Sequence, residues 1–131
     1  VSNAEYLASF LSGKEEVSWV KHPSLKSHKG HKLASKLMPK GTGAIISFGL
    51  KGGRKTAVKF IENLKLISHL ANIGDAKSLV IHPASTTHAQ LKKSELKKIG
   101  ISEDLIRISV GIEDLDDILN DINSAIFKAF K

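Results

Sequence analysis

The chain has 131 residues, which suffice for one domain with an ordinary hydrophobic core but are few for a complete cofactor-dependent enzyme. It contains no cysteine, which excludes disulfides, thiolate nucleophiles and thiolate metal sites. Apolar residues make up 41% of the sequence and occur in short runs, none approaching the roughly 18 residues that span a bilayer. Because no secretory signal begins the sequence, we expect a soluble cytoplasmic protein.

The net charge of +7 is distributed unevenly. Residues 1–100 contain 17 lysines and arginines against 6 acidic residues, whereas residues 101–131 contain 3 against 7. The lysines are scattered singly and few aromatic residues accompany them, so the arginine clusters and stacking groups of a nucleic-acid interface are missing. A basic interaction domain without a ligand remains one hypothesis, but specific nucleic-acid binding is not expected.

The first dozen residues predict a helix, because Leu7, Phe10 and Leu11 share one face and Gly13 follows as a stop signal. The sequence begins with Val1, in the middle of this helical pattern, rather than with Met. We therefore expect that the numbering begins inside a longer protein or that upstream residues have been lost.

The next part of the chain predicts two strands and two helices. Residues 17–20 alternate like a strand that His22 and Pro23 end, and residues 44–50 form the most apolar run, which indicates a central strand. The predicted elements are a strand over 17–20, a lysine-rich helix over 27–37, a strand over 44–50 and an amphipathic helix from 54 to about 69.

The second half predicts two more strands and two more helices. The last helix carries several aspartates in its first turn, where the helix dipole favours negative charge. The predicted elements are a strand over 78–81, a polar loop over 85–88, a helix over 92–98, a strand over 105–110 and a helix over 113–130. The sequence therefore predicts a single α/β domain, with three or four strands covered by helices.

Four clusters resemble ligand sites, but each lacks an essential part. Residues 49–56 have the outline of a phosphate-binding loop, but Arg54 occupies the position that must be glycine. The histidines over 22–31 have no adjacent carboxylate and lie among lysines, which would repel a metal cation. The acidic residues over 113–121 lack calcium-loop spacing, and the hydroxyls over 85–87 lack the G-x-S-x-G motif of a nucleophile.

Arg107 is one of only two arginines and lies between Ile106 and Ile108 in an alternating apolar run. A strand there would hold a permanently charged guanidinium beside a buried wall, which is costly unless a planar anion meets it. Arg107 is therefore either half of an internal ion pair, with Asp104 or Glu113, or a receptor for a carboxylate. On the residues alone the internal ion pair is favoured.

The segment Leu79–Asp117, with LVIHPASTTH, DLIRISVG and IEDLDD, resembles the Cys/Met-metabolism enzymes, a pyridoxal-phosphate-dependent family. The resemblance covers nearly the whole chain, and residues 72–88 are most similar to the O-acetylhomoserine sulfhydrylase branch. The cystathionine synthase and lyase branches would be expected to read Ser-Leu-Gly-Gly over 72–75 and to carry Met at position 86, where this sequence has Asn-Ile-Gly-Asp and Thr.

The resemblance implies a fold and a domain organisation. It implies the carboxyl-terminal domain of a fold-type I pyridoxal-phosphate enzyme, with a small, mostly antiparallel sheet covered by helices and with residues 1–13 as the end of a linking helix. The Schiff-base lysine and the phosphate-binding residues of the family belong to the large amino-terminal domain, which is absent here. The chain alone is therefore expected to bind no pyridoxal phosphate and to be inactive, and no residue in it is expected to be catalytic.

The resemblance also implies a site and an activity. Arg107 falls on the family arginine that grips the substrate α-carboxylate in a bidentate fork, which reverses the preference for an ion pair. Asn72 falls where related enzymes place a serine that helps to hold this carboxylate. Thr87 is the third expected substrate-binding residue, and His88 belongs to the loop at the substrate entrance. The full-length protein would form homocysteine from O-acetylhomoserine and sulfide in methionine biosynthesis, as a homodimer or homotetramer. The alternatives are another member of the family, a cystathionine synthase or lyase, or a stand-alone amino-acid-binding module without catalysis.

Overall fold

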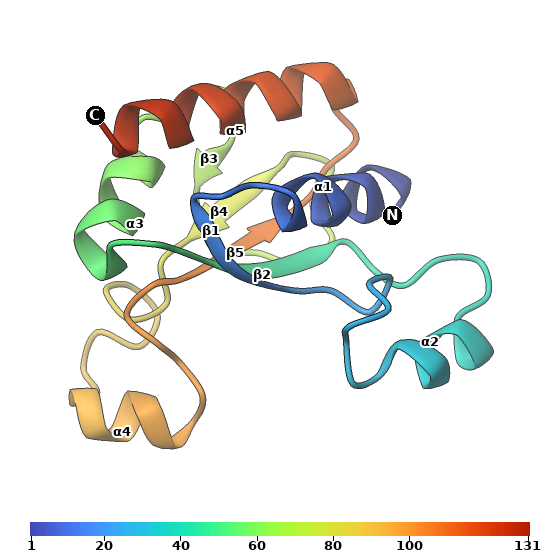
Figure 1. Cartoon of the computed structure of the whole chain (residues 1–131), viewed down its shortest axis with the longest axis horizontal. Helices are drawn as coiled ribbons and strands as arrows, with labels where there is room; N and C mark the ends of the chain where they lie inside the picture. Colours follow the sequence, from blue (N-terminus) through green and yellow to red (C-terminus); the bar gives the residue numbers. More distant parts are fainter.

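The computed structural model describes all residues 1–131 as one sheet with helices packed on it (Figure 1). The helices are α1 (Ser2–Ser12), α2 (His31–Leu37), α3 (Gly53–Glu62), α4 (Lys93–Lys98) and α5 (Leu115–Ala129). The strands are β1 (Val17–Lys21), β2 (Ile45–Leu50), β3 (Ser68–His69), β4 (Leu79–Ile81) and β5 (Leu105–Ser109). Every strand and helix expected from the sequence is present, and the predicted fold class is confirmed. No helix combines the length and the apolar character needed to cross a membrane.

The five strands lie in the order β1-β2-β5-β4-β3. All neighbouring pairs are antiparallel except β3 and β4, which run parallel. The sheet thus has five strands where three or four were expected; the strand that was missed is β3, which consists of only two residues and carries no strand pattern of its own. The mostly antiparallel arrangement agrees with the expectation.

The predicted helix from residue 54 to about 69 is wrong at its end, because α3 stops at Glu62. The Asn63 side chain donates to the Lys59 carbonyl at 2.7 Å and so closes the last turn. The Asp121 carboxylate of α5 then accepts the backbone N–H groups of residues 65, 66 and 67 at 2.8, 2.9 and 3.0 Å. These three bonds hold the segment extended and lead it into β3.

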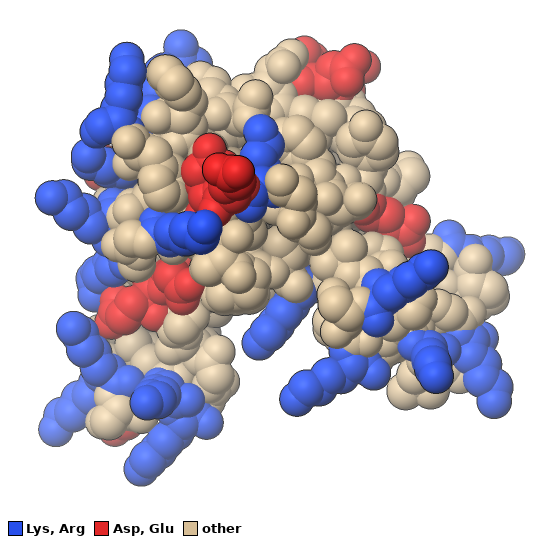
Figure 2. Space-filling model, in the orientation of Figure 1, with Lys and Arg blue, Asp and Glu red and all other residues tan.

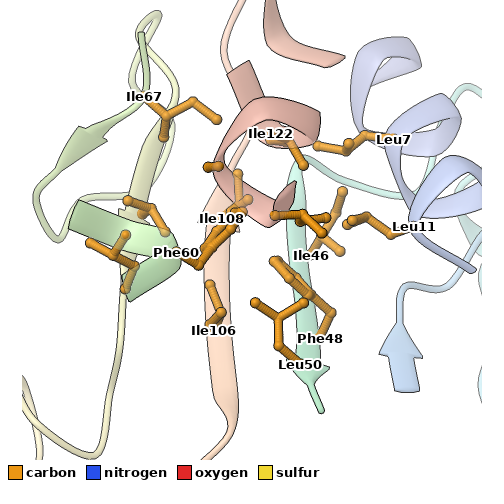
Figure 3. Close-up of a cluster of buried hydrophobic side chains, with 14 of the residues drawn as sticks. Leu7, Leu11, Ile46, Phe48, Leu50, Phe60, Ile67, Ile106, Ile108 and Ile122 are labelled. Atoms are coloured by element: carbon orange, nitrogen blue, oxygen red, sulfur yellow. The ribbon is translucent and has the colours of Figure 1, made fainter. Parts of the chain in front are cut away.

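The hydrophobic core lies between one face of the sheet and the helices α1, α3 and α5 (Figures 1 and 3). Phe48 of β2 and Phe60 of α3 meet edge to face, with ring centroids 5.8 Å apart. The labelled core side chains converge from several elements of the fold and from the segment before β3: Leu7, Leu11, Ile46, Phe48, Leu50, Phe60, Ile67, Ile106, Ile108 and Ile122. This core fixes the sheet that carries the candidate site.

The helices α2 and α4 do not join this layer but project from the molecule as two separate arms (Figure 1). Helix α2 begins at His31, later than the expected residue 27, because residues 22–30 form successive turns. In one of these turns the His28 Nδ1 atom accepts the Gly30 N–H at 3.0 Å. Between the two arms, part of the second face of the sheet has no helix packed on it.

Candidate functional site

Arg107 lies on the face of β5 that points away from the helical layer. Its neighbours Ile106 and Ile108 are fully buried in the core, and successive side chains of a strand point to opposite faces. Arg107 is half-buried, with Ser47 of β2 opposite it on one side and Ile81 of β4 on the other. The alternation that the sequence predicted therefore holds, and it directs the guanidinium to the side without helices.

The Arg107 guanidinium makes no hydrogen bond or ion pair with other residues of the protein; the single salt bridge joins Arg54 to Glu103 at 3.6 Å. Asp104 instead accepts the Trp19 indole N–H at 2.9 Å and the Ser18 hydroxyl at 3.3 Å. Glu113 accepts the backbone and side-chain donors of Ser78. The internal ion pair favoured by the residues alone is therefore wrong, and the guanidinium retains all its donors for a planar anion.

Trp19 lies against the same face of the sheet, over Gly49 of β2. A Cβ atom at Gly49 would collide with the Trp19 indole and with the Asp104 carboxylate, so only glycine leaves room for this hydrogen-bonded pair. The Lys21 Nζ atom lies 5.1 Å from the Trp19 ring centroid, which is the geometry of a cation–π contact. These residues were not predicted as parts of a site, because their proximity depends on strand register.

A hollow of about 630 Å³ opens on the same face of the sheet, between the sheet and α4. Trp19, Ser47 and Leu105 line it on the sheet side, and Leu96 and Ile101 line it from α4 and the following turn. Ser47 is the cross-strand neighbour of Arg107, and Leu105 precedes Arg107 by two residues on the same face. Neighbours of Arg107 therefore line the hollow, although Arg107 itself does not.

The loop that carries Thr87 leaves β4 at the strand position opposite Arg107. His82 fixes its base: Nε2 donates to the Glu103 carbonyl at 2.6 Å, so Nδ1 accepts the Ser85 hydroxyl at 2.7 Å. Both ring nitrogens of this buried histidine are used, which makes its function structural. Thr87 is exposed farther along the loop, with its hydroxyl 2.9 Å from the His88 Nδ1 atom.

Asn72 lies in the exposed loop between β3 and β4, and its amide is engaged there. Its oxygen accepts the Ile73 N–H at 2.8 Å, and its nitrogen donates to the Asp75 carboxylate at 3.3 Å. No hydrogen bond joins Asn72 to Arg107 or Thr87. Among the three predicted site residues, the structure brings the base of the Thr87 loop beside Arg107 but does not connect Asn72 to either.

The loop of Asn72 is attached to the end of β5 through Glu113. The Glu113 carboxylate accepts the Ser78 N–H and hydroxyl, both at 2.7 Å, and the Ser78 hydroxyl accepts the Gly111 N–H at 2.8 Å. Burial alone would raise the pKa of Glu113, but these hydrogen bonds and nearby Lys77 outweigh burial and hold the pKa below its ordinary value. Charged Glu113 therefore stabilises the folded state.

Glu113→Gln is expected to lower the free energy of unfolding at pH 7 and to have less effect in acid. The native pKa lies below the unfolded one, so the contribution of Glu113 is present above the ordinary pKa of 4.5 and is lost as pH falls through the native pKa. Urea unfolding at pH 7 and at about pH 3 measures the difference. Glu62→Gln, at an exposed carboxylate, is the control, and an equal Glu113→Gln effect at both pH values would contradict the assignment.

The fold and the arginine place the chain in a class of domains found in pyridoxal-phosphate enzymes. The structure matches a protein described as an O-acetylhomoserine (thiol)-lyase from Campylobacter jejuni, solved with N′-pyridoxyl-lysine-5′-monophosphate, with a TM-score of 0.89 and 40% identity over 96% of this chain and 30% of the other. It also matches cystathionine γ-synthase from Xanthomonas oryzae in complex with aminoacrylate and cysteine, with a TM-score of 0.91 and 37% identity over 98% of this chain and 33% of the other.

Sequence comparison identifies the family to which the chain belongs. Residues 1–127 match the model of the Cys/Met metabolism PLP-dependent enzymes, and the chain belongs to this family. It is 51% identical to homocysteine synthase from Schizosaccharomyces pombe over 96% of this chain and 29% of the relative. It is 45% identical to O-acetyl-L-homoserine sulfhydrylase 1 from Thermus thermophilus over 96% and 30%, respectively. The chain thus spans about three-tenths of the length of these relatives.

Proposed function

We propose that this chain is the carboxyl-terminal, substrate-carboxylate-binding domain of a cytoplasmic O-acetylhomoserine sulfhydrylase that assembles as a homodimer or homotetramer. In the proposed reaction the bond between the γ-carbon of O-acetylhomoserine and its ester oxygen breaks and acetate leaves, while hydrosulfide forms the new C–S bond of homocysteine. The names and identities of the curated relatives support this activity over others of the family. The reaction would supply homocysteine for methionine biosynthesis.

One observation carries the proposal: Arg107 presents an unpaired guanidinium on the sheet face that lacks a helical layer. The fork geometry of arginine matches the two oxygens of a carboxylate, and the half-buried position strengthens such a pair relative to one in water. We assign the substrate α-carboxylate to Arg107. Thr87 is the next candidate, because its loop starts beside Arg107, and Asn72 would have to exchange its local hydrogen bonds for one to the substrate.

The residues of this chain do not fit the aldehyde end of pyridoxal phosphate. All 18 lysines are exposed or half-buried, so none lies in the desolvated pocket that activates an amine. We therefore assign the cofactor to residues outside this chain. When bound there, pyridoxal phosphate supplies the electron sink for chemistry at the amino-acid carbon, while this chain binds and orients the carboxylate.

A cystathionine synthase is the second candidate, because the X. oryzae enzyme matches this fold as closely as the thiol-lyase does. The two candidates differ in the sulfur donor, sulfide or cysteine. Supplying the full-length enzyme with O-acetylhomoserine and each donor in turn separates them. Homocysteine formed from sulfide at the higher kcat/KM supports the sulfhydrylase, and more efficient cystathionine formation from cysteine would replace it with the second candidate.

The 131-residue chain alone is expected to bind pyridoxal phosphate only through scattered, reversible Schiff bases on surface lysines. Borohydride reduction followed by peptide mapping should show substoichiometric labelling of many lysines, and the chain should form no homocysteine. The same treatment of the urea-unfolded chain is the control and should give a similar pattern. Stoichiometric labelling of one lysine, with turnover, would show that the chain has its own cofactor site and is an enzyme in its own right.

A further inference from the structure

The hollow between the sheet and α4 combines an apolar lining with a basic rim. Trp19, Leu96, Ile101 and Leu105 are its apolar lining residues, and Lys21, Lys93 and Lys97 border it. Lys21 reaches it from β1, and the other two lysines reach it from α4. In Figure 2, lysine and arginine side chains gather over the α4 arm, which forms one wall of the hollow.

One carboxylate, Glu103, also lines the hollow. Its Oε2 atom is buried and accepts no hydrogen bond, although the Arg54 guanidinium lies 3.6 Å away. A buried carboxylate oxygen without a hydrogen-bond donor is unusual, but a ligand in the hollow would meet the exposed part of this side chain, which is 32% exposed overall. The hollow thus offers positive charge for an anion and one carboxylate, Glu103, for an ammonium group.

These properties match a particular class of ligand. A small anion is attracted by the lysines, whose charge offsets the cost of moving the anion from water to the aromatic and aliphatic lining. A thiol amino acid would use the same features, with its carboxylate toward the lysines and its ammonium toward Glu103. Neutral or cationic ligands would gain no binding energy from the charges of the lysines at the rim.

We propose that this hollow receives the anionic sulfur donor of the reaction, next to the carboxylate held by Arg107. The proposal rests on the proposed function, which supplies a second, sulfur-containing reactant. Hydrosulfide and cysteine share the chemistry that the lysines recognise. Glu103 distinguishes them, because only cysteine carries an ammonium group.

The test uses the full-length enzyme with Lys21→Gln and Lys97→Gln combined, since these lysines face the hollow from opposite sides. The double variant is expected to raise KM for sulfide about three- to tenfold at low ionic strength, and several hundred millimolar salt should shrink this difference. KM for O-acetylhomoserine should stay unchanged. Lys128→Gln, on the last turn of α5 in the opposite layer, is the matched control and should change neither KM.

Glu103→Gln is expected to raise KM for cysteine and to leave KM for sulfide unchanged. An unaltered sulfide KM in the lysine double variant, or an equal change in Lys128→Gln, would overturn the proposed site while the sulfhydrylase assignment stands. A wild-type enzyme that turns over neither donor would instead overturn the proposed function, and this inference with it.

Discussion

Replacing Arg107 with Ala in the full-length enzyme is expected to lower kcat/KM for O-acetylhomoserine by a factor between about 30 and several thousand. This range corresponds to ~2–5 kcal/mol, the usual cost of losing one partner of a buried charged contact. The main effect should fall on amino-acid binding, because Arg107 positions the substrate without taking part in bond making. Steady-state kinetics at saturating sulfide measure the change.

Arg107→Lys should also lower kcat/KM for O-acetylhomoserine, because an ammonium group cannot reproduce the two parallel hydrogen bonds of a guanidinium. The second arginine provides a matched control. Arg54 is exposed and lies 3.6 Å from the partly buried Glu103 carboxylate, so Arg54→Lys keeps the positive charge of this pair and should change KM for O-acetylhomoserine little. Wild-type kinetics in both Arg107 variants would show that the arginine does not hold the carboxylate.

Phe48→Ala is expected to lower the free energy of unfolding of the protein by ~3–5 kcal/mol, a large share of the stability of a domain this size. Phe48 is fully buried at the centre of the core, in edge-to-face contact with Phe60, and its removal leaves a cavity. Urea unfolding followed by circular dichroism measures the loss.

Phe127→Ala is the matched control, because Phe127 lies on the outer side of α5 and is 66% exposed. The Lys131 ammonium lies 5.3 Å from its ring centroid, and removing this exposed ring should cost less than about 1 kcal/mol. Equal destabilisation by the two substitutions would mean that the core does not lie where the structure places it.

Much of the fold follows from local patterns in the sequence. The alternation of Ile106, Arg107 and Ile108 correctly predicted a strand with one buried face, and the aspartates after Glu113 correctly marked the start of α5. Asp114 is the N-cap of that helix and accepts the N–H groups of Asp116 and Asp117. Such signals act over a few residues and are visible in the sequence itself.

The features that were missed depend on partners far apart in the sequence. The end of α3 and the position of β3 are set by Asp121, which lies more than 50 residues away. Asp104 and Glu113 were expected as partners for Arg107, but Trp19 and Ser78 occupy them across separations of 85 and 35 residues. The local sequence pattern does not reveal these pairings. Only the structure shows that the Arg107 guanidinium has no partner within the protein.

In the candidate site, too, some features were predictable from the sequence and others depend on contacts between distant residues. The resemblance to the family singled out Arg107, Asn72 and Thr87, each from its position in a motif. The hollow could not be predicted, because Lys21, Ser47 and Leu105 come from three strands and meet only through their register. Whether Asn72 and Thr87 contact the substrate stays a prediction.

The carboxylate assignment is tested most directly by comparing two unreactive ligands that differ only in that group. L-norvaline carries the α-carboxylate and n-butylamine lacks it, and calorimetric titration of the full-length enzyme gives both affinities. Arg107→Ala is predicted to weaken L-norvaline binding by at least about 30-fold, ~2 kcal/mol, and to leave n-butylamine binding unchanged. If Arg107→Ala weakened both ligands equally, or neither, Arg107 would not be the carboxylate receptor and the central claim would fail.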